Sequence, residues 1–264
     1  MKYIFVTDMD GSLLNNKSEL NTYTIDKINK ISELGHLVVL ASGRSLMGMV
    51  KYYRLLNLKT PIISLNGAFI KYPDGNIKVH YIKPNLVKEL YEKNSTILKS
   101  MMLNEPNNII SFKHNKELER IFNGDNYDEV TLYDNNKTYD KVLNVICLID
   151  DKDRSKFESF FEGKEISPRY WGSYNGNAFY DIYQNNISKA TAIKEVLDYY
   201  NTSTNNLFTF GDGVNDVEML KLSSNGVAMK NGLDAVKKAA THITAFDNNN
   251  DGIARFIANY LMID

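Results

Sequence analysis

Short apolar runs alternate with segments of helical periodicity in the first part of the chain. Apolar runs span 3–6, 37–40 and 61–65, and each is of a length typical of one strand. Between them, isoleucines recur at helical spacing within 25–34, and a second helix is expected over 45–56. Continuous apolar strands separated by helices are typical of a parallel sheet that helices cover on both faces.

The pattern changes after Gly67. Residues 68–72 and 77–81 favour an antiparallel hairpin, because the four residues Pro73–Asn76 between them are turn formers. The segment that follows mixes helical and strand-like patterns without regular alternation. Its expected elements are a helix over 86–99, a strand over 142–149, a helix over 153–161, and strands over 168–171 and 178–183. This mixture predicts an α+β insert rather than more of the parallel sheet.

Alternation of strands and helices returns at Ser188. The expected elements are a helix over 189–200, a strand over 207–210, a helix over 217–222, a strand over 227–229, and helices over 235–240 and 252–262. The sequence therefore predicts an α/β fold, a Rossmann-like doubly wound parallel sheet core with an inserted α+β cap domain. The core comprises residues 1–83 and 187–264 in this prediction, and the cap comprises residues 84–186.

Composition narrows the classes of protein that remain. The chain has 264 residues, of which 43% are hydrophobic and 24% charged, values typical of a folded globular chain. A net charge of −1 gives no general attraction to nucleic acid or to an anionic membrane, and no apolar run is long enough to span a bilayer. The apolar run at the N-terminus is too short for a signal peptide, and Cys147 is the single cysteine. We therefore expect a cytoplasmic protein with no nucleic-acid or membrane partner.

Polar side chains follow four of the predicted core strands. They are Asp8 and Asp10 after the first, Ser42 after the second, Asn66 after the third, and Asp212 after the strand over 207–210. In an open parallel sheet, ligands gather at the carboxyl ends of the strands. The carboxylates suit a hard cation such as Mg²⁺, while Ser42 and Lys189, which opens a helix, suit an anion. Phosphoryl transfer needs both kinds of group.

The turn Asp8-Met9-Asp10-Gly11 offers two carboxylates one residue apart. A carboxylate can attack phosphorus and form an aspartyl-phosphate, and a second one nearby can protonate the leaving oxygen and then activate water. An ordinary acidic turn after a strand remains an alternative for this short motif. The hexapeptide Gly211–Asp216 is more specific, because Asp212 lies at a strand end, although Asp216 also suits the start of a helix.

Taken in order, five motifs resemble those of the haloacid dehalogenase superfamily of phosphatases. They are Asp8-Met9-Asp10-Gly11-Ser12-Leu13, Ser42-Gly43-Arg44, Asn66-Gly67-Ala68, Ser188-Lys189 and Gly211-Asp212-Gly213-Val214-Asn215-Asp216. The Asn-Gly-Ala motif and the position of the insert resemble the Cof-type, class IIB sub-group. The resemblance implies a Mg²⁺-dependent enzyme whose cap covers the carboxyl ends of the sheet.

The resemblance also implies roles for the acidic residues. Asp8 would be the nucleophile and a metal ligand, and Asp10 the general acid/base, with its backbone carbonyl also on the metal. Asp212 would be a further ligand, and Asp216 would bind the metal directly or through water. Asn215 would orient this acidic loop.

For the phosphoryl group, the resemblance implies that Ser42 and Lys189 hold the oxygens. Backbone N–H groups of Met9 and Gly43 are further expected donors. Two residues would line the entrance or brace the loops, namely Arg44 and Asn66. Taken singly, Ser42 is as well explained by a turn hydroxyl, Lys189 by a solvated charge and Arg44 by a structural ion pair.

The sequence departs from the family pattern at two positions, where Ala190 and Lys230 replace the usual glycines. Lys230 adds a cation that could alter substrate preference. In the cap, four residues are weak candidates for substrate contact, because such side chains more often pack in a core: Arg169, Tyr170, Trp171 and Tyr174. Cys147 is expected in the core, and the four histidines show no metal-binding spacing.

We therefore predict a Mg²⁺-dependent phosphomonoesterase that hydrolyses small organic phosphates, either sugar phosphates or nucleotides, through an aspartyl-phosphate. Its partner would be a small phosphorylated metabolite. One alternative is a phosphotransferase similar to a phosphohexomutase, and another is a non-catalytic, receiver-like phospho-binding domain. A receiver does not need Asp10 or so long an insert, so these features favour an enzyme.

Overall fold

The computed structural model describes residues 2–263 except 107, 114, 116–117 and 119–129, and the chain divides into two compact units. The first unit comprises Met1–Lys78 and Ser188–Asp264, and the second comprises Val79–Ile187. The second unit thus begins before the residue 84 expected from sequence, because Ile82 is buried in the apolar core of that unit and its N–H donates to the carbonyl of Val142.

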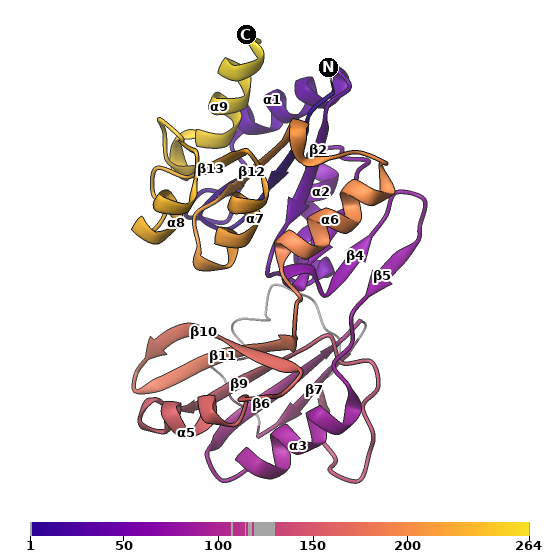
Figure 1. The fold of residues 1–264 in the computed structure, drawn as a ribbon, viewed down its shortest axis with the longest axis vertical. Helices are drawn as coiled ribbons and strands as arrows, with labels where there is room; N and C mark the ends of the chain where they lie inside the picture. The colour runs from indigo at the N-terminus through magenta and orange to yellow at the C-terminus, as the bar shows by residue number, and fades with distance from the viewer. Residues whose placement is uncertain (1, 107, 114, 116–117, 119–129, 264) are drawn as a thin grey trace. The chain divides into compact units, whose positions relative to one another are not determined.

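The first unit is built on an eight-stranded sheet with the order β14-β13-β12-β1-β2-β3-β4-β5 (Figure 1). The strands are β1 (Ile4–Thr7), β2 (Leu37–Ala41), β3 (Ile62–Ser64), β4 (Phe69–Lys71), β5 (Ile77–Val79), β12 (Leu207–Gly211), β13 (Asn225–Ala228) and β14 (His242–Ile243). The run from β14 to β3 is parallel, and β4 is antiparallel to β3. The parallel part matches the prediction, while the two-residue β14 was not predicted.

Helices cover both faces of this sheet. They are α1 (Thr22–Glu33), α2 (Leu46–Leu55), α6 (Lys189–Tyr199), α7 (Val217–Leu222), α8 (Asp234–Ala239) and α9 (Gly252–Leu261). Phe5 packs in the cluster that includes side chains of α1, α2 and α9, whereas its neighbour Ile4 packs with α6 and α7. Alternate residues of a strand point to opposite faces, so a continuous apolar run is buried on both. The predicted doubly wound α/β core is confirmed.

The second unit contains a six-stranded sheet with the order β10-β11-β9-β6-β7-β8. Its strands are β6 (Leu98–Glu105), β7 (Asn108–Phe112), β8 (Val130–Leu132), β9 (Asn144–Asp150), β10 (Ile166–Tyr174) and β11 (Asn177–Gln184), and its helices include α3 (Pro84–Asn94) and α5 (Arg154–Ser159). Neighbouring strands are antiparallel except β7 and β8. Both helices contribute to one apolar cluster with the sheet.

One helix boundary in the second unit was predicted wrongly. The helix expected over 86–99 ends at Asn94, and residues from Leu98 onward form β6. Leu98 pairs with Ile149 of β9, a contact distant in sequence that the local apolar pattern does not contain. Cys147, on β9, is buried in the core as predicted, and burial raises the pKa of its thiol well above the usual range.

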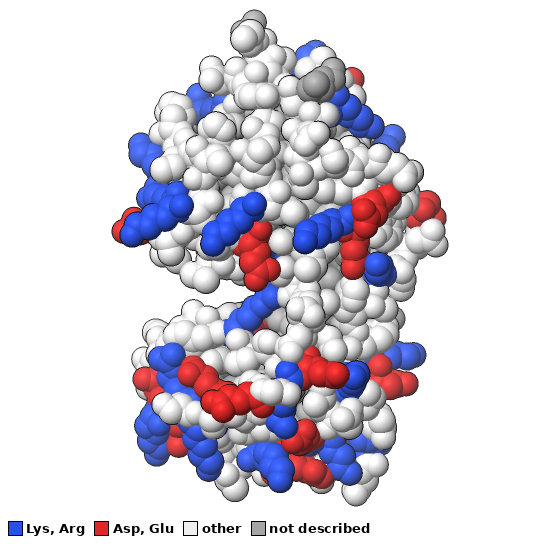
Figure 2. Space-filling view, in the orientation of Figure 1, with Lys and Arg blue, Asp and Glu red and all other residues white. Residues whose placement is uncertain are grey.

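Charges of both signs are interspersed over the surface shown in Figure 2. This arrangement agrees with the near balance of 31 basic and 32 acidic residues in the chain. Within the described part of the chain, no helix has the length and apolar character needed to cross a bilayer.

Candidate active site

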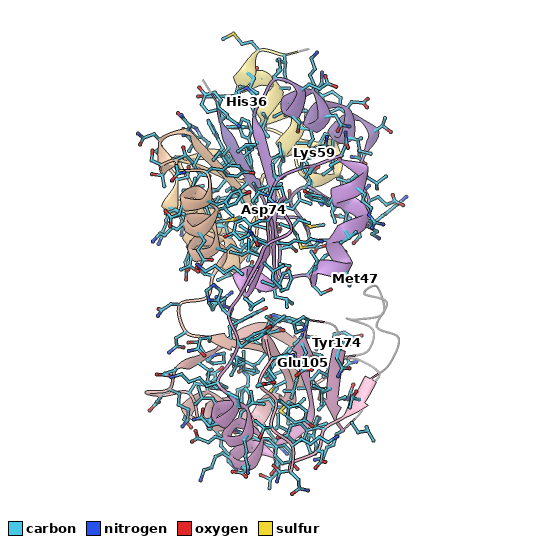
Figure 3. The ribbon with its side chains drawn as sticks, turned by 90° about the vertical axis from the view of Figure 1, so that its right-hand side faces the viewer. His36, Met47, Lys59, Asp74, Glu105 and Tyr174 are labelled. Carbon is cyan, nitrogen blue, oxygen red and sulfur yellow. The ribbon has the colours of Figure 1, made fainter. Side chains whose placement is uncertain are left out.

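Four neighbouring strands of the first unit bring the predicted motifs to one edge of the sheet. The order β12-β1-β2-β3 is parallel throughout, so the residues that follow these strands lie along the same edge. In Figure 3, His36 and Lys59 mark the amino ends of β2 and β3, and Met47 in the first turn of α2 marks the carboxyl end. The candidate site is at this carboxyl edge.

Lys189 is at the centre of the site. Ser188 caps α6 through a reciprocal pair of hydrogen bonds with Thr191, which places Lys189 at the first helical position. The side chain is fully buried, and its Nζ donates to Asp8 and, at 2.7 Å, to Oδ1 of Asp216. Burial opposes the charge, but attraction from Asp216 and Asp8 outweighs it and raises the pKa of the ammonium. Lys189 is therefore not a solvated surface charge, which was the alternative explanation that the sequence left open for this residue.

Three carboxylates surround this lysine. One oxygen from each of Asp8, Asp212 and Asp216 lies within 4.8 Å of the other two. Burial, with repulsion from Asp216 and Asp212, raises the pKa of Asp8 well above its usual range despite Lys189. Burial also raises the pKa of Asp212 to about 6, against a hydrogen bond from Ser12 that lowers it.

The donor set fits a divalent cation. Its oxygens are the hard ligands that Mg²⁺ and similar ions prefer. When all three carboxylates are ionised, they and the one ammonium leave two negative charges in a largely buried place, which a divalent ion would neutralise. These residues could therefore hold the metal that the family resemblance implies.

Asp216 is the most constrained of the three. Its Oδ2 accepts the N–H groups of Asp212 and Gly213, both at 2.9 Å, while its Oδ1 accepts from Lys189. A carboxylate oxygen accepts about two hydrogen bonds, so only Oδ1 of Asp216 retains capacity for a metal. Asp216 also immediately precedes α7, as the helix-start explanation expects, and this position is compatible with a role in the site.

The carboxylate of Asp10 lies apart from this acidic cluster. It is half exposed and pairs with Arg44 through two contacts, Nε to Oδ2 at 2.7 Å and Nη2 to Oδ1 at 2.5 Å. The hydrogen bond that Arg44 donates to Asp10 is the main cause that raises the pKa of Arg44. Arg44 also lies 5.4 Å from the ring centre of Tyr52 and contacts Ser18. Arg44 is thus an ion-pair partner, and the metal contact through the Asp10 carbonyl stays a prediction.

Ser42 lies directly after β2, and Met9 lies in the turn after β1. Ser42 is buried, and its Oγ accepts the N–H of Arg44 at 3.1 Å, which leaves the hydroxyl hydrogen available for a further acceptor. The Met9 side chain is fully buried in the core, so its backbone is the part that could face a ligand. Asn215 donates from Nδ2 to Oδ1 of Asn66 at 2.9 Å, and this contact joins two of the motifs.

Two positioning contacts were missed from the sequence. Ser12 donates from Oγ to Oδ1 of Asp212 at 2.7 Å, and Asn231 donates from Nδ2 to the carbonyl of Gly11 at 2.7 Å. Ser12 belongs to the first motif, which was a usable signal, whereas nothing local marked Asn231. A Cβ on Gly11 would lie 2.4 Å from Oδ2 of Asp212, so only glycine lets the two loops approach this closely. Lys230, which precedes Asn231 in the chain, is exposed.

The buried lysine and its carboxylates, at the carboxyl edge of a parallel sheet, are the features of a phosphoryl-transfer enzyme of the α/β class. Comparison with known proteins gives the family. A model of the haloacid dehalogenase-like hydrolase family matches residues 5–257, and the chain belongs to this family. The resemblance found in the sequence is thereby confirmed.

Individual relatives agree with this assignment. The chain is 30% identical over 269 residues to the 5-amino-6-(5-phospho-D-ribitylamino)uracil phosphatase YitU of Bacillus subtilis, covering 99% of this chain and 98% of that one. A haloacid dehalogenase-like hydrolase from Bacteroides thetaiotaomicron is 25% identical with a TM-score of 0.82, covering 98% of this chain and 100% of that one. The subclass IIB sugar phosphatase BT4131 has the same fold, with 21% identity, a TM-score of 0.82 and coverage of 99% and 100%.

The family match and the phosphatase relatives make this chain an enzyme of the phosphatase class. The prediction of a phosphatase is confirmed, and the non-catalytic receiver-like alternative is wrong.

Proposed function

We propose that the protein is a Mg²⁺-dependent phosphomonoesterase that works through an aspartyl-phosphate on Asp8. The observation that carries the proposal is the buried Lys189, shared by Asp8 and Asp216 with Asp212 alongside. This arrangement supports a nucleophilic carboxylate held in place by a cation that can also contact phosphoryl oxygens.

The first half of the reaction transfers the phosphoryl group to the enzyme. A carboxylate oxygen of Asp8 attacks phosphorus, the bond from phosphorus to the ester oxygen breaks, and Asp10 gives its proton to that leaving oxygen. Lys189 and Ser42 hold the phosphoryl oxygens, with N–H groups of Met9 and Gly43. Bound among Asp8, Asp212 and Asp216, Mg²⁺ would supply charge neutralisation.

The second half releases inorganic phosphate. Asp10, now ionised, takes a proton from water as the water oxygen attacks phosphorus. The bond from phosphorus to Asp8 breaks, and the original carboxylate is restored. Arg44 donates one hydrogen bond to each oxygen of Asp10, which leaves each oxygen able to accept a proton while the ion pair holds the carboxylate in place.

For the substrate, we propose a small metabolite with a phosphate ester on a sugar or sugar-alcohol chain. YitU acts on a phosphoribityl compound, and BT4131 is a sugar phosphatase, which supports this class above nucleotides. A phosphotransferase that passes the phosphoryl group to a second sugar would share the same residues. The cytoplasmic location stays a prediction.

A direct test measures phosphate release with Mg²⁺ from para-nitrophenyl phosphate, from sugar phosphates, from 5-amino-6-(5-phospho-D-ribitylamino)uracil and from nucleotides. We expect turnover that stops when EDTA removes the metal and returns when Mg²⁺ is restored. Trapping with beryllium fluoride should place the adduct on Asp8, and an adduct on any other residue would refute the mechanism. Consumption of a sugar phosphate without release of inorganic phosphate would favour the phosphotransferase.

A further inference from the structure

Three consecutive residues after β3 have left-handed backbone conformations. The φ angles are 48° at Leu65, 53° at Asn66 and 105° at Gly67. Residues other than glycine seldom adopt positive φ, and asparagine tolerates it better than most. Such conformations persist only where the surrounding structure holds them, and they often mark functional sites.

The backbone of this turn contacts two of the predicted motifs. The N–H groups of Leu65 and Asn66 donate to the carbonyls of Arg44 and Ser42, each at 2.9 Å. A Cβ on Gly67 would lie 2.5 Å from the carbonyl oxygen of Ser188, at the start of α6. The turn is therefore packed between the Ser42–Arg44 segment and the helix that carries Lys189.

The Asn66 side chain reaches a third motif. It is buried, and its Oδ1 accepts from Nδ2 of Asn215 at 2.9 Å. On its other side, the amide nitrogen of Asn66 lies 3.2 Å from where a Cβ on Gly43 would stand. The amide of Asn66 thus lies between the expected phosphate-holding turn at Gly43 and the acidic loop Gly211–Asp216.

We propose that Asn66 is a positioning residue that sets the spacing between the phosphate-holding turn and the metal-holding loop. The inference rests on the proposed function and adds to it a contact that acts on the metal through Asn215. The position needs a residue that tolerates the left-handed conformation and carries an amide oxygen for Asn215, and asparagine meets both needs.

Mutation can separate the requirement for a left-handed backbone at position 66 from the requirement for a side-chain amide. Asn66→Gly keeps the backbone conformation and removes the amide, so it isolates the side-chain contact. We expect the thermal midpoint to change by less than about 3 °C, while the Kd for Mg²⁺, measured by calorimetric titration without substrate, rises about tenfold. Turnover of para-nitrophenyl phosphate at saturating Mg²⁺ should fall by about tenfold or more, because misplacement of reacting groups is costly.

The matched control is Asn57→Gly. Asn57 also has a left-handed backbone, with φ of 48°, but it is exposed and follows the end of α2. Its replacement should leave Mg²⁺ binding and turnover unchanged.

A double-mutant cycle tests whether Asn66 acts through Asn215. In an Asn215→Ala background, Asn66→Gly should change the Kd for Mg²⁺ by less than about twofold. An unchanged Kd in Asn66→Gly alone, or an equal change in both backgrounds, would overturn the inference. The metal titration does not require turnover, so inactivity of the unmutated enzyme toward every phosphate ester would count against the proposed function and not against this contact.

Discussion

The acidic cluster of the first unit and a polar network in the second unit both bury a carboxylate, but they supply it with different partners. In the first unit, Asp8 and Asp216 share the ammonium of Lys189. In the second, Asp181 on β11 accepts from Nδ2 of Asn144 at 2.6 Å and from the hydroxyl of Tyr183 at 2.5 Å. The donors on its two oxygens are therefore uncharged.

The two buried sites differ in what would neutralise their negative charge. Burial raises the pKa of Asp181 to about 7, against hydrogen bonds from Tyr183 and Asn144 and a weaker attraction from Arg169 that lower it. A proton is enough to make this group neutral. The cluster around Lys189 carries two negative charges when its three carboxylates are ionised, and a divalent ion would neutralise it. Under the proposed function, the acids that share Lys189 take part in the reaction, whereas Asp181 with its neutral donors links neighbouring strands of a sheet.

The largest effect should follow from Asp8→Asn, which removes the nucleophile from the first arrangement. We expect turnover of para-nitrophenyl phosphate to fall by at least about 10⁴-fold, because the proposed covalent intermediate forms on the Asp8 carboxylate. The exposed Asp26→Asn on α1 is the control and should keep full activity. Substantial hydrolysis by the Asp8 variant would contradict the nucleophile role proposed for Asp8.

Lys189→Met tests the shared cation. Removal of the ammonium leaves buried carboxylates without a cationic partner, so we expect a loss of about 3–5 kcal/mol in the free energy of unfolding by urea. Added Mg²⁺ should restore part of this loss, since it neutralises the same carboxylates. Lys194→Met, exposed on the same helix, should change stability little. Equal stability of the two variants would contradict the role given to Lys189.

The pH dependence of stability tests the buried Asp181 of the second unit. Because folding raises the pKa of Asp181 from 3.8 to about 7, the folded state keeps a proton that the unfolded state loses above pH of about 4. The stability contributed by this proton is present at low pH and is lost as pH rises through about 7, at about 1.4 kcal/mol per pH unit.

Asp181→Asn should flatten this decline in stability. The measurement is the free energy of unfolding of the second unit in urea at several pH values between about 4 and about 7. The exposed Glu162→Gln in the same unit should retain it. An identical pH profile for the Asp181 variant and the unmutated protein would show that Asp181 does not hold the proton.

Arg44→Met should produce the smallest change and the most selective one. If Asp10 supplies a proton to the leaving oxygen, loss of its partner should matter more for alkyl phosphates, which are poor leaving groups, than for para-nitrophenyl phosphate. We expect about a tenfold difference between the two losses in kcat, and little further effect of Arg44→Met in an Asp10→Asn background. Arg54→Met on α2 is the exposed control, and equal losses for both substrates would exclude a role through Asp10.

Most core elements could be predicted from local pattern. The apolar runs at β1, β2 and β12 are buried on both faces, so their composition alone marks them as central strands. The stripe in α1 and Gly35 after it mark that helix and its end, and Gly35 has the expected positive φ of 87°. The strand β6 was missed because its pairing with β9 is distant in sequence.

The sequence by itself determined the class of chemistry, because the order and residue types of the five motifs are local properties of the chain. The tertiary structure decided which charges meet. Lys189 reaches Asp8 across 181 positions, and Arg44 takes both oxygens of Asp10. Asn66 joins Asn215 across 149 positions. These pairings depend on the strand order that brings β12, β1, β2 and β3 together, and this order is a property of the folded sheet that no local segment of the chain contains.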